Sequence, residues 1–152
     1  YRFYQLTYAK RSGHGGYLSR DFFVTTAAGM GDQVVMVLAY LDTRAVAGAL
    51  YFCSNDTLYG RYWGCEEEYD CLHFEACYYQ GIEYCIANKL ARFDPGAQGE
   101  HKIQRGFRPI TTWSNHWIAD PDLSAAVGDF THREEEQNDL YLQAATKMLP
   151  FK

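Results

Sequence analysis

Residues 34–65 read VVMVLAYLDTRAVAGALYFCSNDTLYGRYWGC, and this stretch decides the fold. It contains three apolar runs, rich in β-branched and aromatic side chains, at 34–40, 45–53 and 57–65. Short polar turns separate the runs. Apolar runs of this length between polar turns are typical of consecutive strands. The stretch therefore predicts a three-stranded antiparallel meander.

The sequence after the meander changes to a helical period. Apolar residues recur at helical spacing over 72–90 and cover most of the circumference, so we expect a helix that is packed on two sides. Cys77, Gly81 and Cys85 lie four residues apart. Small side chains at this spacing would let the helix approach a sheet closely.

Shorter signals predict the remaining elements. Residues 1–11 are typical of the end of a helix, and Ser19 or Asp21 caps a second helix that ends near Gly31. Further along, we expect a short strand at 90–93, a helical turn at 100–105, a half-buried strand at 107–118, and a helix from Pro121 to Met148. This order predicts an α+β fold, a mainly antiparallel sheet flanked by helices, in one domain over 1–152.

The composition is that of a globular chain. Hydrophobic residues make up 47% of the 152 residues and charged residues 22%. The most hydrophobic run, 34–40, is far shorter than the about 20 residues of a spanning helix, so no membrane span is expected. The first residues do not resemble a signal peptide. Because the five cysteines form no CxxC pair, we expect a cytoplasmic protein with reduced thiols, of which Cys77 and Cys85 are buried.

The charge is unevenly distributed along the chain. The formal net charge is −5, which argues against a protein that coats nucleic acid. Residues 89–108 nevertheless carry five basic and two acidic side chains, whereas 119–152 carry seven acidic and three basic ones. The basic segment indicates either an anionic ligand or a solvated surface that pairs with the acidic tail.

The most informative part of the basic segment is its loop. Gly96 and Gly99 flank Gln98, and Lys102 and Arg105 follow three residues apart. Backbone N–H groups at such a junction can form an anion-binding nest, and the two cations would share one side of a helical turn. The loop is not a Walker motif. Ligand binding and a plain surface loop explain it equally well.

The histidines are compatible with acid–base chemistry, and their spacing does not predict a metal site. His73 and Glu75 open the central helix and could act in proton transfer or simply cap the helix. Ser114 and His116 are two apart in the predicted strand and are more typical of a hydrogen-bonded pair than of a catalytic dyad. The five histidines contain no HExxH motif, and we expect no metal site.

Several strings occur in the same order in one protein family. They are YLSRDFF at 17–23, LYGRYWG at 58–64, LHFEACYYQ at 72–80, GAQGEHK at 96–102 with RGF at 105–107, and SNHWIADP at 114–121. The chain resembles the FemAB-like proteins of peptidoglycan biosynthesis and recognition, in the GNAT superfamily of acyl-CoA N-acyltransferases. The resemblance covers nearly the whole chain.

The resemblance implies a GNAT-like fold, in which a mixed sheet opens as a V between two central strands. Family members are longer and have two GNAT-like halves, and this chain resembles the C-terminal one, so an N-terminal half is an implied partner. Fem-type relatives move an amino acid from aminoacyl-tRNA onto an amine of a peptidoglycan precursor. Acetyl-CoA-binding relatives carry a Gly-containing phosphate loop after the central strand. Here CEEEYD at 65–70 follows instead, and acids repel phosphate, which favours the Fem-type donor or no donor at all.

The first functional hypothesis is an N-acyltransferase or aminoacyltransferase module, with acyl-CoA or aminoacyl-tRNA as donor, a small-molecule or peptide amine as acceptor, and no tightly bound cofactor. The resemblance implies that Gln98 acts near the reacting carbonyl and that His73 or Glu75 accepts the proton. The cleft would be lined by Arg61, Tyr62 and Trp63. Phosphate or the 3′ end of tRNA would be held by Lys102 and Arg105, beside Gly96 and Gly99. The alternatives are a non-catalytic module that recognises peptidoglycan peptide or precursor, and a structural half-domain. A homo-oligomer is compatible with each.

Overall fold

The computed structural model describes residues 1–97 and 99–151. The chain divides into two compact units, Tyr1–Ala97 and Gln98–Lys152, and each is described by itself. The elements of the first unit are α1 (Arg2–Ser12), α2 (Arg20–Met30), the 3₁₀ turn η1 (Gly31–Gln33), β1 (Val34–Leu41), β2 (Arg44–Cys53), β3 (Thr57–Cys65), α3 (Leu72–Phe74), the π-helical η2 (Glu75–Tyr79), α4 (Gln80–Ala87) and β4 (Arg92–Asp94). The second unit contains η3 (Glu100–Arg105) and α5 (Pro121–Lys147). That 1–152 forms one domain stays a prediction.

The sheet of the first unit has four strands in the order β1-β2-β3-β4. The first three pair antiparallel, which confirms the predicted meander, and β4 pairs parallel with β3. Register shifts interrupt the ladders after Ala39 and after Leu50. Together with the flanking helices, this sheet confirms the α+β class.

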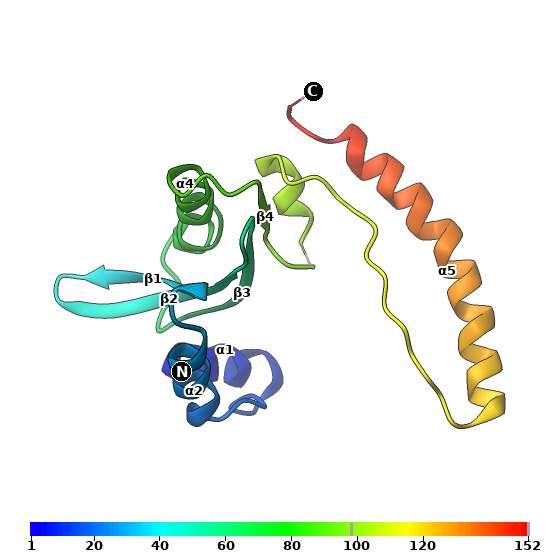
Figure 1. The fold of residues 1–152 in the computed structure, drawn as a ribbon, viewed down its shortest axis with the longest axis horizontal. Helices are drawn as coiled ribbons and strands as arrows, with labels where there is room; N and C mark the ends of the chain where they lie inside the picture. The colour runs from blue at the N-terminus through cyan, green and yellow to red at the C-terminus, as the bar shows by residue number, and fades with distance from the viewer. Residues whose placement is uncertain (98, 152) are drawn as a thin grey trace. The chain divides into compact units, whose positions relative to one another are not determined.

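Helices cover both faces of this sheet (Figure 1). On one face α1 lies against β3, where Gly64 makes the approach possible because a Cβ there would collide with the carbonyl group of Phe3. The Thr7 hydroxyl donates to the Trp63 carbonyl over 2.8 Å. At the start of α1, Arg2 pairs with the Glu66 carboxylate at 2.8 Å, and Arg44 of β2 pairs with the same carboxylate at 3.0 Å. These polar contacts hold α1 at the end of β3.

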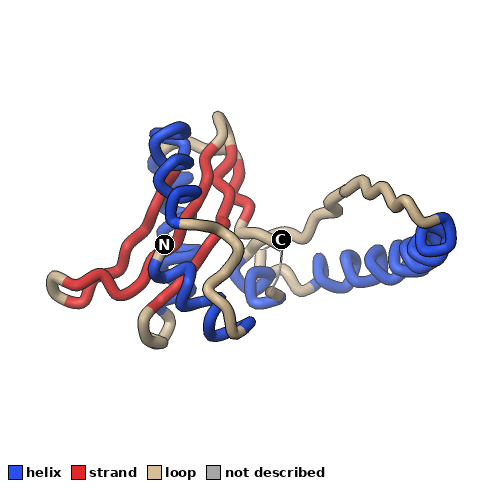
Figure 2. The backbone as a smooth tube through the Cα atoms, turned by 90° about the horizontal axis from the view of Figure 1, so that it is seen from below, coloured by secondary structure: helices blue, strands red, loops and turns tan. Residues whose placement is uncertain are grey.

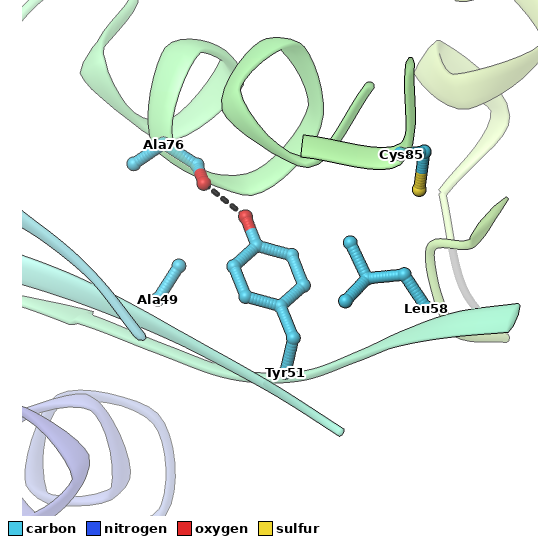
Figure 3. Close-up of a cluster of buried hydrophobic side chains, with 5 residues drawn as sticks. All are labelled: Ala49, Tyr51, Leu58, Ala76 and Cys85. Carbon is cyan, nitrogen blue, oxygen red and sulfur yellow. Dashed lines mark hydrogen bonds between the residues drawn. The ribbon is translucent and has the colours of Figure 1, made fainter. Parts of the chain in front are cut away.

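The other face carries the hydrophobic core (Figure 3). Its fully buried members are Tyr51 and Leu58, and the helical segment contributes Ala76 and Cys85. The Tyr51 hydroxyl donates a hydrogen bond to the Ala76 carbonyl. Burial raises the pKa of Tyr51, with a further contribution from the Cys77 thiol, so the hydroxyl keeps its proton.

The helix predicted over 72–90 is present from 72 to 87, with a π-helical segment inside it. In that segment the Gln80 N–H bonds to the Glu75 carbonyl, five residues back. The extra residue shifts the phase, so that Ala76 rather than Cys77 lies in line with Gly81 and is buried. The expectation that Cys77 is buried is therefore wrong: it is half-buried, whereas Cys85 is buried as predicted.

The close approach predicted for Gly81 is confirmed, because a Cβ there would collide with the ring of Phe93 in β4. The helix ends three residues earlier than expected. Lys89 has a positive φ of 56°, and the Leu90 N–H returns to the Cys85 carbonyl at 2.9 Å, which closes the last turn. The following strand is displaced accordingly, from the predicted 90–93 to 92–94.

In the second unit the predicted helical turn and long helix are both present. The Asp120 side chain caps α5 by accepting from the Leu123 N–H over 2.9 Å, with Pro121 in the first turn. Figure 2 shows an extended loop that joins η3 to α5. The strand predicted over 107–118 is wrong: these residues form no strand, and Trp113 and Trp117 are 84% and 87% exposed. A strand needs a neighbour to pair with, and the described part of this unit contains no other strand.

The glycine at the α1–β3 contact can be tested with a matched pair of variants. Gly64→Ala forces α1 away from β3, and we expect it to lower the free energy of unfolding by about 1–3 kcal/mol. Gly29→Ala, in α2 with nothing within 4 Å of its Cβ, should instead raise it by up to about 1 kcal/mol. Urea unfolding of both variants measures the difference. Equal stabilities would contradict the close packing at Gly64.

The Tyr51 hydroxyl can be removed without changing the ring. In Tyr51→Phe the buried Ala76 carbonyl loses its donor, and we expect a loss of about 1–3 kcal/mol in the free energy of unfolding. Tyr40→Phe, at a side chain that is 59% exposed, should change it by less than about 0.5 kcal/mol. Chemical denaturation of the two variants provides the measurement, and an unchanged Tyr51→Phe stability would refute the role of the bond.

Candidate functional site

The two parallel strands of the first unit pair only briefly. Their register covers three residue pairs, from Thr57 with Arg92 to Tyr59 with Asp94. Pro95 follows β4 directly, and it cannot continue the ladder because it has no N–H group. Its backbone lies against Gly60, where a Cβ would be 3.4 Å from the Pro95 Cα. The ladder between β3 and β4 therefore ends at Tyr59 and Asp94, while the two backbones remain close at Gly60 and Pro95.

Beyond the end of this ladder, β3 continues from Gly60 to Cys65. In the part of the chain that the structure describes, no strand pairs with this section on the side away from β2. We call this section, together with Pro95, the β3 fork. On this strand edge the Trp63 carbonyl accepts from Thr7, and the remaining backbone groups can bind an extended ligand by strand addition. Such an edge beside a covered face is where a site can form.

An aromatic group lies at the fork on the face that α3, η2 and α4 cover. The Trp63 ring meets the His73 ring edge-on, with centroids 5.4 Å apart. His73 contacts Tyr78 in the same way at 5.5 Å, and Phe74 at 5.4 Å. The imidazole is half-buried, so it is held by rings and still reaches solvent. A histidine in this position can accept a proton from a group bound at the fork.

Only one of the three predicted cleft residues joins His73. Tyr62 points to the opposite face, where its ring contacts Tyr4 at 5.2 Å and Phe23 at 6.0 Å. Arg61 is exposed, and its guanidinium lies 4.7 Å from the centroid of the Tyr62 ring. Successive side chains of a strand alternate between faces, so Tyr62 and Trp63 do not line one cleft.

Glu75 is exposed at the start of the π-helical segment. Its carboxylate accepts a hydrogen bond from the Gln80 side chain over 2.8 Å. This bond joins two side chains on the surface of one helix. It is compatible with the structural role that the sequence left open for Glu75. His73, packed on Trp63, is thus the better placed of the two predicted proton acceptors.

The predicted anion loop is divided at the boundary between the units. Gln98 lies outside the described residues. In the first unit, Gly96 has a φ of 87° and its N–H donates to the Asp94 carboxylate over 2.8 Å. In the second, Gly99 has a φ of 107° and the His101 ring folds over it, where a Cβ would collide. One Gly N–H is thus directed at a carboxylate of the chain itself.

Lys102 and Arg105 are both half-buried on η3. The Arg105 guanidinium donates from Nη1 to the His101 carbonyl over 2.7 Å, so part of its hydrogen-bonding capacity serves the turn itself. The pKa of His101 is lowered by partial burial and then by the charges of Arg105 and Lys102. This shift indicates that η3 carries a local positive potential.

Burial raises the pKa of the Cys85 thiol, with a contribution from Cys53, so Cys85 is a packing residue rather than a nucleophile. The described residues contain no group of three side chains that could hold a metal ion. No helix among them has the length and apolar character that crossing a bilayer requires. Ser114 and His116 do form a hydrogen bond, 2.8 Å long, within the exposed loop.

Comparison with known proteins shows which family the chain belongs to. The family model of FemAB-like proteins, described as peptidoglycan biosynthesis/recognition, matches residues 1–152, the whole chain. The chain belongs to the FemAB-like family. No curated protein and no solved structure matches this FemAB-like chain. The family assignment confirms the resemblance noted in the sequence and connects the chain to peptidoglycan biosynthesis or recognition.

Three features of the FemAB-like chain were missed in the sequence. Pro95, directly after a short strand, was the signal for the fork, because proline ends a strand ladder. Gly99, two residues before His101, was the signal that the His101 ring packs onto the backbone, since a side chain at residue 99 would occupy that space. The hydroxyl of Tyr51 left no signal, since an alternating apolar run does not show which helix carbonyl will lie opposite it.

The lowered pKa of His101 predicts a pH dependence. Because the folded chain binds this proton more weakly than the unfolded chain, His101 makes stability fall as the pH drops below about 6.5. Lys102→Gln should move the titration midpoint of His101 upward, whereas Lys10→Gln, in α1, should leave it unchanged. NMR titration of the histidine ring protons measures both. A midpoint above 6.5 in the wild type would contradict the assignment.

Proposed function

We propose that this FemAB-like chain is an N-acyltransferase or aminoacyltransferase module that acts on an amine of a peptidoglycan precursor. The observation that carries the proposal is the β3 fork with Trp63 and His73 at its covered face. A parallel ladder that ends after three residue pairs supports a GNAT-like sheet, in which the opening receives the reacting groups. The family supports the precursor as the acceptor class.

The proposed step joins the acceptor amine to the donor carbonyl. The amine nitrogen attacks the carbonyl carbon of an ester or thioester, a C–N bond forms, and the C–O or C–S bond breaks. His73 accepts the proton that the nitrogen loses, and the leaving oxygen or sulfur receives a proton in turn. Backbone N–H groups at the strand edge stabilise the developing oxyanion, and the role near the reacting carbonyl that the resemblance implies for Gln98 stays a prediction. Positioning at the strand edge supplies the orientation.

The charges of the chain bear on the donor. The Glu66 carboxylate is neutralised by Arg2 and Arg44, but Glu67 and Glu68, which follow it, remain exposed. These two acids oppose a pyrophosphate beside the end of β3, which favours an aminoacyl-tRNA ester over acetyl-CoA. The resemblance implies that Lys102 and Arg105 of the second unit contact the donor phosphate, and this role stays a prediction.

Recognition without transfer is the second candidate. The edge of β3 from Gly60 to Cys65 offers backbone groups to an extended peptide, and such binding needs no proton acceptor. In this case the aromatic side chains near the fork supply contact surface for the precursor peptide. The two candidates differ in one respect, which is whether a new amide bond forms.

The deciding experiment is an assay of the full chain with a lipid-free peptidoglycan precursor that carries a free amine. An aminoacyl-tRNA and an acyl-CoA are offered in separate reactions, and mass spectrometry follows the precursor. We expect a mass gain equal to one aminoacyl group. His73→Ala should lower the rate by about 10²–10⁴-fold without loss of precursor affinity.

His132→Ala, on the exposed surface of α5, is the matched control and should keep the wild-type rate. Calorimetric titration of the precursor accompanies each assay. Precursor binding without product from either donor would overturn transfer in favour of recognition. Neither binding nor product would refute both candidates.

A further inference from the structure

The second unit contains an open cavity of about 410 Å³ that none of the roles above uses. Arg108 and Pro109 line it from the loop after η3. The other walls come from the end of α5 and the residues after it: Thr146, Lys147, Leu149 and Phe151. The volume lies within the range of small-molecule sites in proteins.

The walls of this cavity are built by specific local structure. Gly106 has a φ of 86°, which turns the chain after η3 toward Arg108. A Cβ at Gly106 would lie 2.9 Å from the Phe151 ring, so the absence of a side chain lets that ring pack closely. Ala145 is buried one turn before the cavity, and the Leu149 N–H bonds to the Thr146 carbonyl over 3.4 Å. Two segments far apart in sequence are thereby held together.

The residues that line the cavity combine positive charge with apolar surface. Arg108 and Lys147 supply two positive charges, and the lining contains no acidic side chain. Pro109, Leu149 and Phe151 supply apolar surface beside them. The end of α5 carries the negative partial charge of a helix C-terminus, which Lys147 in its last turn offsets. Arg108 belongs to the basic segment 89–108, whereas Lys147 is one of three basic side chains among the seven acidic ones of 119–152.

We propose that the second unit binds a small organic anion, an apolar body that carries one carboxylate or phosphate group, between Arg108 and Lys147. The Arg108 guanidinium matches either group with two parallel hydrogen bonds, and Lys147 adds a second charge. The apolar body lies against Leu149 and Phe151. This site is separate from the β3 fork and does not depend on the proposed transfer reaction.

The test uses the full chain and four probes of matched size or charge. Octanoate and octyl phosphate carry both features, octanol lacks the charge, and acetate lacks the apolar body. Calorimetric titration should show saturable binding of at least one of the two octyl anions, at least about tenfold tighter than octanol or acetate. The tighter of the two anions identifies the head group.

Variants then locate the binding. Arg108→Gln and Lys147→Gln should each weaken the octyl anion by about tenfold, and Phe151→Ala should weaken it to a similar degree. Arg133→Gln, an exposed arginine of α5 outside the cavity, is the matched control and should bind as the wild type does. Thermal melts confirm that each variant is folded. Octanol binding as tightly as octanoate, or an equal loss in Arg133→Gln, would overturn the proposal, as would no binding of either octyl anion.

Discussion

The hydrogen bond from the Tyr51 hydroxyl to the Ala76 carbonyl is the constraint on which the first unit depends. Tyr51 is 1% exposed in the middle of β2, so its hydroxyl must find an acceptor inside the protein. The helical segment meets this demand near its π-helical turn between Glu75 and Tyr79, where the Ala76 carbonyl lies at the Tyr51 hydroxyl (Figure 3). A regular helix would keep one phase through these residues, whereas the π-helical turn shifts the phase at this point.

That change of phase also places the candidate site. Before the π-helical turn, His73 lies on Trp63 at the fork. After it, Gly81 and Cys85 lie near β4, where Gly81 contacts the Phe93 ring. One helical segment therefore serves both the packing of β4 and the position of an imidazole. Proline after β4 completes the arrangement, since it ends the pairing that would otherwise cover this edge of β3.

Sequence patterns predicted the helices and strands that form from contacts between residues close together in the sequence. The meander followed from apolar runs and polar turns, the start of α2 from the cap candidates Ser19 and Asp21, and the start of α5 from Pro121. The π-helical turn was not predictable, because apolar residues cover the whole helix and hide a shift of phase. The strand expected at 107–118 failed for another reason: alternation describes two faces but does not supply a neighbouring strand. For the site, the family strings named His73 and Trp63, whose rings are in contact, and Tyr62, which strand geometry assigns to the other face; the roles of these residues stay predictions.

The contact of α1 with β3 has a consequence for how the first unit forms and opens. Thr7 and Trp63 are 56 residues apart, so their contact closes a long loop, whereas the turns of the meander close short ones. The Tyr4 hydroxyl also accepts from the N–H groups of Tyr17 and Leu18, which ties the next segment to α1. We therefore expect helices α1 and α2 to open together. Amide protons in these two helices should then exchange ahead of those in β2.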